Sequence, residues 1–340
     1  MTGTTPGITR RALPGLALPL ALPLAGPAAA QAPAQAPAQS PAPTAAPASL
    51  TLLLDWFVNP DHAPIVVAQE AGFFGRAGLA VRTIAPADPN DPPRMVAARQ
   101  ADLGVYYQKN LHLAVDQGLP LVRVGTLVAT PLSTLSVLRD GPIRSLADLR
   151  GKRIGFSTAG FEEVAVGTIL GTVGLGVRDV QLVNVNFGLS SALMSGQVEA
   201  ILGGFRNFEL HQLEIEGRPG RAFYPEQHGM PIYDELIYVA HRDRARDPAL
   251  RRFMDALEGA TTFLINNPDE SWKMFIAGPR KELDNELNRR AFRDTLNRFA
   301  LAPAALDANR YQRFARFLHD KAMIGAVPPV ERYAVELPAA

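Results

Sequence analysis

The sequence contains no cysteine. A chain without cysteine has no disulfide framework, no thiolate metal site and no cysteine that a lipid could modify. The sequence also lacks a G-x-S-x-G nucleophile elbow, an H-x-x-x-H pair and a phosphate-binding P-loop, the motifs of common hydrolases, zinc enzymes and nucleotide enzymes. The segment GTVGLG follows a predicted helix and lacks the glycine spacing of a dinucleotide fingerprint. These absences favour a binding protein without a cofactor over an enzyme.

Neither sign of charge predominates, because 34 lysines and arginines stand against 33 aspartates and glutamates, for a formal net charge of +1. The charges are interspersed, so no basic patch indicates nucleic acid or an anionic membrane as partner. Beyond residue 30 no apolar stretch is long enough and free enough of charge to span a bilayer. We therefore expect a monomer whose partners are a small molecule and other proteins.

The first 30 residues have the pattern of an export signal. Arg10 and Arg11 precede an apolar run, and small residues follow at 28–30; the paired arginines suggest the twin-arginine route. Residues 31–49 are rich in alanine and proline and predict an extended tether without a core. We expect a cleaved signal peptide over 1–30 and a periplasmic location; a disordered terminus without export function is the alternative.

Strand-like and helix-like segments alternate along the rest of the chain, beginning with SLTLLLDW and HAPIVVAQEAGFF. Such alternation predicts an α/β fold with mainly parallel sheets covered by helices. About 290 residues exceed one typical core, so two lobes are expected. Residues 50–134 with 239–340 would form lobe 1, and 135–238 an inserted lobe 2. The crossings would lie near Ser133–Leu138 and 235–239, with a ligand between the lobes.

The segment DWFVNPDHAP brings polar and aromatic residues to the end of the first predicted strand. Asp55 and Trp56 end the strand, and a tryptophan at the edge of a crevice is a plausible stacking platform; a core residue covering the sheet edge is the alternative. Asn59 and His62 lie in the turn that opens the next helix. Without a nucleophile, metal partner or cofactor lysine, this segment is interpreted as one wall of a binding pocket.

Two further strand ends supply candidate ligand-binding residues. Tyr106 and Tyr107 end the third strand, where alternation sends one side chain inward and the other outward, so one major contact is expected. In STAGFEE, Phe161 precedes Glu162 and Glu163 at the start of a helix. Acids at a helix start occupy the favourable dipole position and would repel phosphate, sulfonate or nitrate. A glutamate facing the crevice would bind an amino group; the alternative is that both face solvent.

The segments GGFRNFEL and PIYDELIYV add aromatic and amide groups. Phe205 and Asn207 lie where the chain leaves another strand, and Tyr233 lies just before the return strand. Arg206 is either a further contact or the partner of a nearby acid in a structural role. Aromatic faces with a few carboxylates and amides suit a flat, uncharged or cationic heteroaromatic amine.

From residue 50 to about 329 the chain resembles the substrate-binding proteins of ABC importers for thiamine-pyrimidine precursors, of the hydroxymethylpyrimidine or formyl-aminopyrimidine type. DWFVNPDHAP and GGFRNFEL are the specific segments, whereas GLPL and LRGKRIG are shared with nitrate, sulfonate and taurine binders. The resemblance implies a type II periplasmic binding fold that closes over an aminopyrimidine and docks on a permease driven by an ATPase. It assigns the pocket to Asp55, Trp56, Tyr106 or Tyr107, Phe161, Glu162 or Glu163, and Asn207.

The same superfamily contains an enzyme, the fungal pyrimidine synthase. It has a lysine for pyridoxal phosphate after the third strand, a histidine four residues later, and a cysteine-rich stretch before the return strand. Here Tyr106 occupies the lysine position, Asn110 the histidine position, and PIYDELIYV replaces the cysteines. Without an amine for the Schiff base this chemistry has no anchor, so we expect no enzyme. A nitrate or alkylsulfonate binder with a basic, donor-rich pocket is the other alternative.

Overall fold

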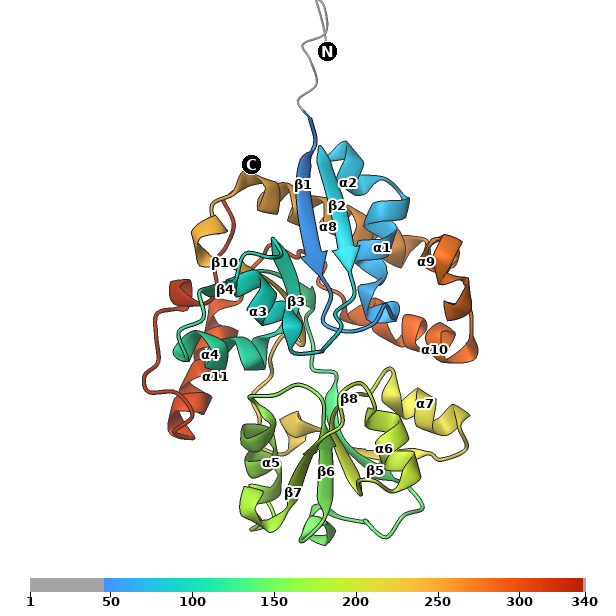
Figure 1. Cartoon of the computed structure of the whole chain (residues 1–340), viewed down its shortest axis with the longest axis vertical. Helices are drawn as coiled ribbons and strands as arrows, with labels where there is room; N and C mark the ends of the chain where they lie inside the picture. Colours follow the sequence, from blue (N-terminus) through green and yellow to red (C-terminus); the bar gives the residue numbers. More distant parts are fainter. Residues whose placement is uncertain (1–45, 339–340) are drawn as a thin grey trace, which may run out of the picture. The chain divides into compact units, whose positions relative to one another are not determined.

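Two five-stranded sheets with flanking helices organise the computed structural model, which describes residues 46–338 (Figure 1). The predicted signal peptide and nearly all of the predicted tether lie outside the described residues. The first strand begins at Ala48, slightly before the predicted start of the folded region at residue 50. The two sheets confirm the predicted α/β class with two lobes.

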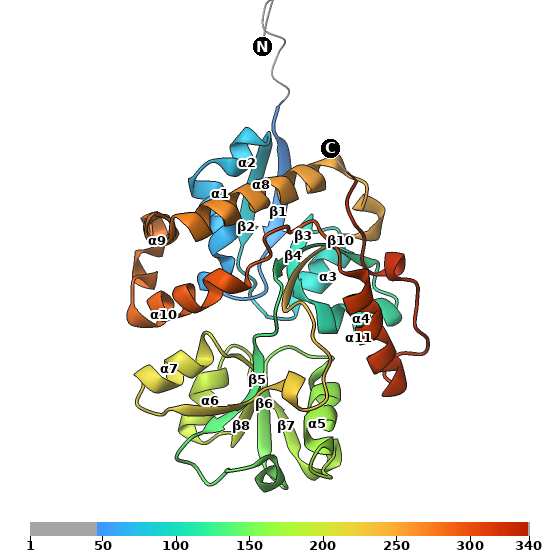
Figure 2. The same ribbon diagram turned by 180° about the vertical axis from the view of Figure 1, so that it is seen from behind.

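Lobe 1 is built around a mixed sheet with strand order β2-β1-β3-β10-β4. β1 pairs in parallel with β2 and β3, whereas β10 runs antiparallel to both β3 and β4. Its strands are β1 (Ala48–Leu53), β2 (Leu79–Ile84), β3 (Leu103–Tyr107), β4 (Leu121–Val128) and β10 (Leu236–His241). Its helices are α1 (Ala63–Glu70), α2 (Phe73–Arg76), α3 (Asp91–Ala97), α4 (Gln108–Asp116), α8 (Pro248–Asn266), α9 (Pro268–Phe275), α10 (Glu286–Thr295) and α11 (Ala308–Asp320). Figure 2 shows the long helix α8 lying across the sheet, beside α1 and α2.

Lobe 2 has the same kind of mixed sheet, with strand order β7-β6-β8-β5-β9. β6 pairs in parallel with β7 and β8, and β5 runs antiparallel to β8 and β9. Its strands are β5 (Ser133–Leu138), β6 (Arg153–Phe156), β7 (Gln181–Asn184), β8 (Ala200–Phe205) and β9 (Gly220–Phe223), and its helices are α5 (Glu162–Gly171), α6 (Leu189–Ser195) and α7 (Glu209–Ile215). Short 3₁₀ turns complete the two lobes: η1 (Pro60–His62), η2 (Leu146–Leu149), η3 (Val177–Asp179), η4 (Pro225–Gln227), η5 (Arg242–Arg244), η6 (Gly278–Leu283), η7 (Leu296–Arg298) and η8 (Val330–Arg332).

The chain passes between the sheets at residues 129–132, after β4, and at 224–235, before β10. The boundaries predicted at 134/135 and 238/239 fall inside β5 and β10, each of which belongs wholly to one sheet. The local pattern of these segments shows that they are strands, but it carries no information about which sheet each one joins.

Every residue of β10, inside the lobe 1 sheet, and of β4, at its edge, is buried. Their largely apolar sequences follow from this burial. Gly125 in β4 allows α8 to pack closely on the sheet, because a Cβ there would lie 2.3 Å from the sulfur of Met254 and would force that side chain to move. Within residues 46–338, no helix combines the length and the apolar character needed to cross a membrane.

Candidate ligand-binding site

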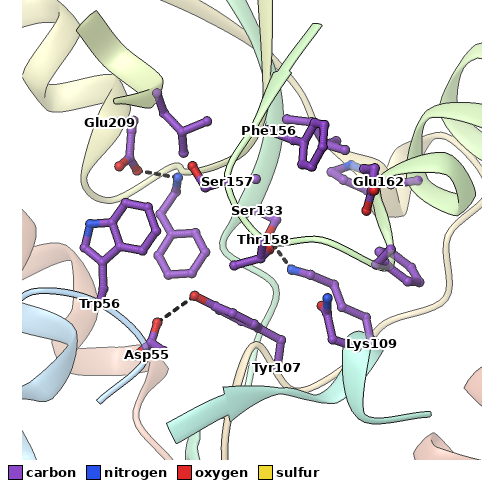
Figure 3. A pocket seen from close by; sticks show the side chains of 18 of the residues that line it. Asp55, Trp56, Tyr107, Lys109, Ser133, Phe156, Ser157, Thr158, Glu162 and Glu209 are labelled. Atoms are coloured by element: carbon purple, nitrogen blue, oxygen red, sulfur yellow. Dashed lines mark hydrogen bonds between the residues drawn. The ribbon is translucent and has the colours of Figure 1, made fainter. Parts of the chain in front are cut away.

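A cavity between the two lobes collects side chains from several strand ends (Figure 3). It comprises about 830 Å³ of space that is continuous with solvent. The carboxyl ends of parallel strands meet at one edge of a sheet, which explains why β1, β3, β6 and β8 all end here. Lobe 1 contributes Asp55, Trp56, Asn59, Asp61, Tyr107, Lys109 and Asn110. Lobe 2 and the crossing segments contribute Ser133, Phe156, Ser157, Thr158, Phe161, Glu162, Ala165, Leu189, Leu202, Gly203, Phe205, Phe208, Glu209, Pro225, Met230 and Tyr233.

Most of the residues predicted from the sequence line this cavity, and their contact with a ligand stays a prediction. The residues that line it are Asp55, Trp56, Asn59, Tyr107, Phe161, Glu162, Phe205 and Tyr233. Those that do not line it are His62, Tyr106, Glu163 and Asn207.

A buried hydrogen-bond network fixes the lobe 1 side of the cavity. The backbone N–H of Asn59 donates to Nδ1 of His62 at 3.3 Å, so Nε2 carries the proton and donates to Oδ1 of Asp55 at 2.9 Å. The phenol of Tyr107 donates to the other oxygen of Asp55 at 2.8 Å (Figure 3). Burial, with the adjacent carboxylate, holds the pKa of Tyr107 well above its usual range, so the phenol stays neutral. His62 therefore positions Asp55, and Tyr107 presents its ring to the cavity.

Trp56 lies directly beyond β1, half-buried at the edge of the cavity. Its ring meets that of Phe187 in lobe 2 edge-on, with centroids 4.5 Å apart. Phe57, the next residue, contacts both Phe187 and Phe208 of lobe 2. This aromatic cluster joins the two lobes beside the cavity and leaves Trp56 in place to contact a flat ring.

The structure distinguishes the members of two adjacent pairs. Tyr107 lines the cavity, whereas Tyr106 packs into the hydrophobic core, as the alternation of a β-strand requires. Glu162 lines the cavity and accepts a hydrogen bond from the backbone N–H of Gly160 at 2.6 Å, whereas Glu163 is exposed. One residue of each pair is therefore available to a ligand.

A buried ion pair lies where the chain crosses between the lobes. Lys109, in the first turn of α4, donates to Oγ of Ser133 at 2.6 Å (Figure 3). It also forms an ion pair with Glu235. The second oxygen of Glu235 accepts from the backbone N–H groups of Leu132 and Ser133 at 2.6 and 2.8 Å. Burial alone would raise the pKa of Glu235, but the Lys109 ammonium and these donors hold it below its usual range. The Lys109 ammonium also lies 5.1 Å from the ring centre of Tyr233.

A second group of buried carboxyls lies on the α7 side of the cavity. Asp61 accepts hydrogen bonds from Asn207 at 2.6 Å and from Thr295 at 3.0 Å, which joins lobe 2 to α10 of lobe 1. Glu209, at the start of α7, accepts from the backbone N–H of Phe205 at 2.6 Å. Burial raises the pKa of Asp61 to about 6 and that of Glu209 to about 7, the latter with a contribution from the Asp61 charge. Asn207 thus bridges the lobes outside the cavity instead of lining it.

Several lining residues were missed from the sequence, above all Lys109, Asn110 and Glu209. From the sequence, Tyr106 occupies the lysine position of the related enzyme, so no amine was expected in the pocket. A signal was present, because Lys109 opens the helix after β3 and Glu235 precedes the return strand. A lysine just after β3 and a glutamate just before β10 predict a pair only when these two strands are known to be neighbours in the sheet. In residues 46–338, no cluster of three or more histidines or acids has the arrangement of a metal site.

Comparison with known proteins gives consistent matches. The family model described as "NMT1/THI5 like" matches residues 59–271. A Haemophilus influenzae protein named "Putative thiamine biosynthesis protein" is 48% identical over 289 residues, which cover 85% of this chain and 92% of that protein. A "Formylaminopyrimidine-binding protein" of Halalkalibacterium halodurans is 30% identical over 230 residues, covering 67% of this chain and 70% of that protein.

More distant similarities include both an enzyme and an alkanesulfonate-binding protein. The "4-amino-5-hydroxymethyl-2-methylpyrimidine phosphate synthase" of Schizosaccharomyces pombe is 26% identical over 258 residues, covering 72% of this chain and 73% of that enzyme. The solved structure of the alkanesulfonate-binding protein SsuA from Xanthomonas axonopodis pv. citri, bound to MOPS, superimposes with a TM-score of 0.68 at 19% identity. It covers 86% of this chain and 99% of that one. This last likeness shows the fold, that of periplasmic binding proteins.

Proposed function

Since the chain belongs to the NMT1/THI5-like family, we propose that it binds an aminopyrimidine precursor of thiamine between its two lobes. The observation that carries this proposal is the charge of the cavity. Among the described residues that line it, Asp55, Asp61, Glu162 and Glu209 bear carboxyl groups, of which Asp55 is engaged by His62 and Tyr107. The sole lysine or arginine in this lining, Lys109, is paired with Glu235. Carboxyl groups without a neighbouring cation favour a ligand that carries N–H donors.

The apolar lining supports a flat ring as the body of this ligand. Trp56, Tyr107, Phe161 and Phe205 all line the cavity, and a heteroaromatic ring gains affinity by stacking on such faces. The relative from Halalkalibacterium halodurans is named for binding a formylaminopyrimidine, which agrees with this combination of rings and acids. Hydroxymethylpyrimidine and formyl-aminomethyl-pyrimidine are therefore the ligands to test.

The proposed biological role is delivery of the ligand to an ABC permease with its ATPase subunits. The fold is that of periplasmic binding proteins, and the N-terminal sequence has the pattern of an export signal. Residues 129–132 and 224–235 would act as the hinge between an open and a closed form. Wild-type protein without its first 45 residues should then stimulate ATP hydrolysis by its permease only when the pyrimidine is present.

Calorimetric titration tests the ligand assignment. Purified protein should release heat with hydroxymethylpyrimidine or with its formyl-aminomethyl counterpart, and Glu162→Gln should weaken binding of whichever ligand binds. Glu163→Gln is the matched control, because Glu163 is exposed and should not affect binding. Absence of heat with both pyrimidines at high micromolar concentration would refute the assignment. Tighter binding of an alkylsulfonate after Glu162→Gln would favour the anion-binding alternative.

The alternative from another class is an enzyme, and one observation favours it, namely the presence of Lys109 in the lining of the cavity. The Nζ of Lys109 reaches the cavity, but it is engaged by Glu235 and Ser133, whereas a Schiff-base lysine must present a free amine. The amine therefore serves the hinge in this proposal. Incubation with pyridoxal phosphate followed by borohydride should leave Lys109 unmodified, and a reduced adduct there would support the enzyme.

A further inference from the structure

Asn110 has one half of its side-chain amide satisfied and the other half not. It lies in the first turn of α4, is 3% exposed and lines the cavity. Its Nδ2 donates to the backbone carbonyl of Ala159 at 3.1 Å, whereas its Oδ1 is buried and has no hydrogen-bond partner within residues 46–338. Native structures rarely leave such an acceptor unpaired, because it has lost its water and gained nothing in return. A buried acceptor at a cavity surface indicates a donor on the ligand.

The partner of Asn110 belongs to the other lobe. Ala159 lies in the loop between β6 and α5 of lobe 2. Both its carbonyl and its N–H form hydrogen bonds with residues of lobe 1. Its carbonyl accepts from Asn110, and its N–H donates to Oδ1 of Asn90 at 2.9 Å. Asn90 is itself fixed by Asp88, which accepts from its backbone and side-chain N–H groups at 2.8 and 2.9 Å. These two bonds join lobe 1 to the loop before α5, whereas the contact between Asn207 and Asp61 joins the lobes just before α7, and Figure 1 shows α5 and α7 on opposite sides of lobe 2.

We propose that Asn110 is a specificity-determining residue that accepts a hydrogen bond from an N–H group of the ligand and transmits this contact to lobe closure. The inference rests on the proposed function and names the group of the ligand that is read. The amide is planar, so the orientation that turns Oδ1 toward a ligand N–H also turns Nδ2 toward Ala159. A ligand that offered a carbonyl instead would require the flipped amide, which would place two oxygens, Oδ1 and that of Ala159, against each other.

The expected ligand group is the exocyclic amino group of an aminopyrimidine. A site built around a buried polar group discriminates strongly against an analogue without the matching donor, because the group is then left unpaired. The preference for the aminopyrimidine over the same ring without its amino group should be about 10- to 100-fold. A residue that only packed against the ring would not distinguish the two compounds.

The test compares two compounds across matched variants by calorimetry. The compounds are 4-amino-5-hydroxymethyl-2-methylpyrimidine and the same ring without the 4-amino group. Asn110→Leu, which is close in size and nonpolar, should bind both compounds with nearly equal affinity. Its thermal midpoint without ligand should equal or exceed that of the wild type, because an unpaired buried acceptor has been removed. Asn90→Ala, which loses the bond to the same Ala159 but does not line the cavity, should weaken both compounds equally and keep the preference.

A second variant keeps the test decisive if Asn110→Leu does not fold. Asn110→Asp retains an oxygen toward the ligand but replaces the donor toward Ala159 by an acceptor. It should weaken both compounds through poorer closure while it retains the preference for the amino group. Persistence of the full preference in Asn110→Leu, or loss of the preference in Asn90→Ala, overturns the inference. Wild-type protein that binds both compounds equally overturns this inference alone, whereas wild-type protein that binds neither overturns the proposed function with it.

Discussion

The hinge side and the α7 side of the cavity each bury a glutamate, and the two carboxyl groups behave in opposite ways. Glu235 at the hinge is held below its usual pKa, because Lys109 and the hydrogen-bond donors around it outweigh the cost of burial. Glu209 at the start of α7 accepts from the backbone N–H groups of Phe205 and of Glu209 itself, and a second acid, Asp61, lies nearby. Burial outweighs the two donors and raises the pKa of Glu209 to about 7. The same residue type at similar burial is therefore a fixed anion in one place and a titrating group in the other.

This difference indicates that the Glu235 charge has a structural role, whereas the Glu209 carboxyl group is available to a ligand. At the hinge, both charges are matched within the protein, so they stabilise the crossing segments and leave nothing for a ligand. On the α7 side, neither Asp61 nor Glu209 forms an ion pair with a lysine or arginine of residues 46–338, so a ligand with N–H donors would favour their ionised form. The predictions that follow remove these groups in order of expected effect.

Replacing Lys109 by methionine should produce the largest effect. It leaves the Glu235 carboxylate buried and uncompensated, which costs about 3–5 kcal/mol of unfolding free energy. In the wild type, the lowered pKa of Glu235 means that its contribution is present above the unfolded-state pKa and is lost as pH falls through the folded-state pKa. Chemical denaturation at pH 7.5 measures the loss.

The double variant Lys109→Met with Glu235→Gln is the control for this prediction. It removes both charges, so it should recover most of the lost stability. A single Lys109→Met variant as stable as the wild type would show that the hinge pair is not a buried ion pair, and the contrast with the α7 side would disappear.

Replacing Glu209 by glutamine should remove a pH-dependent change of up to about 3 kcal/mol in the free energy of unfolding. The folded-state pKa of about 7 exceeds the ordinary value of 4.5, so the folded protein binds more protons than the unfolded chain between these values. Wild-type stability therefore falls as pH rises from about 5 to 7. Urea unfolding across this range should show a shallower slope for Glu209→Gln and a gain in stability above pH 7. The exposed Glu163→Gln variant is the control. If Glu209→Gln showed the same dependence of unfolding free energy on pH as this control, the raised pKa of Glu209 would be contradicted.

Replacing Trp56 by alanine tests whether the aromatic cluster near the α7 side serves the ligand. Loss of a stacking surface should weaken binding of the pyrimidine by about 1–3 kcal/mol, measured by calorimetry, and ligand should perturb tryptophan fluorescence in the wild type. Trp272→Phe is the control, because Trp272 packs against Phe275 and Phe292, away from the cavity. Equal affinity in Trp56→Ala would assign Trp56 to packing alone.

The exposed ion pair between α7 and α10 should contribute least. Glu214 and Arg290 approach to 3.3 Å across the lobes, but both side chains are exposed. Glu214→Gln should change stability and affinity by about 0–1 kcal/mol. A larger loss in thermal unfolding or in calorimetric affinity would place the α7 contact, instead of the buried carboxyls, at the centre of closure.

Much of this architecture was predictable because it depends on local sequence patterns, such as the alternation of strand-like and helix-like segments. The alternation of strands and helices predicted two α/β lobes, and the resemblance of DWFVNPDHAP and GGFRNFEL to a known family is confirmed by the family match. Asp55, Tyr107 and Phe205, which were expected at strand ends facing a crevice, line the cavity, and their contact with a ligand stays a prediction. Asn207 shows the limit of the approach, because its place beside a strand end did not reveal that its amide binds Asp61 and Thr295.

The sequence by itself therefore determined the periodicity of each element and the residue types at the strand ends. Only the tertiary structure decided which side of each end faces the cavity and which distant groups meet there. Lys109 and Glu235 are 126 residues apart in the chain, and Asn110 and Ala159 are 49 apart. Such pairs depend on sheet order and on the meeting of two lobes, and a local pattern contains neither. The sequence therefore predicts which residues end each strand, and the packing of the two lobes determines which of these residues line one cavity.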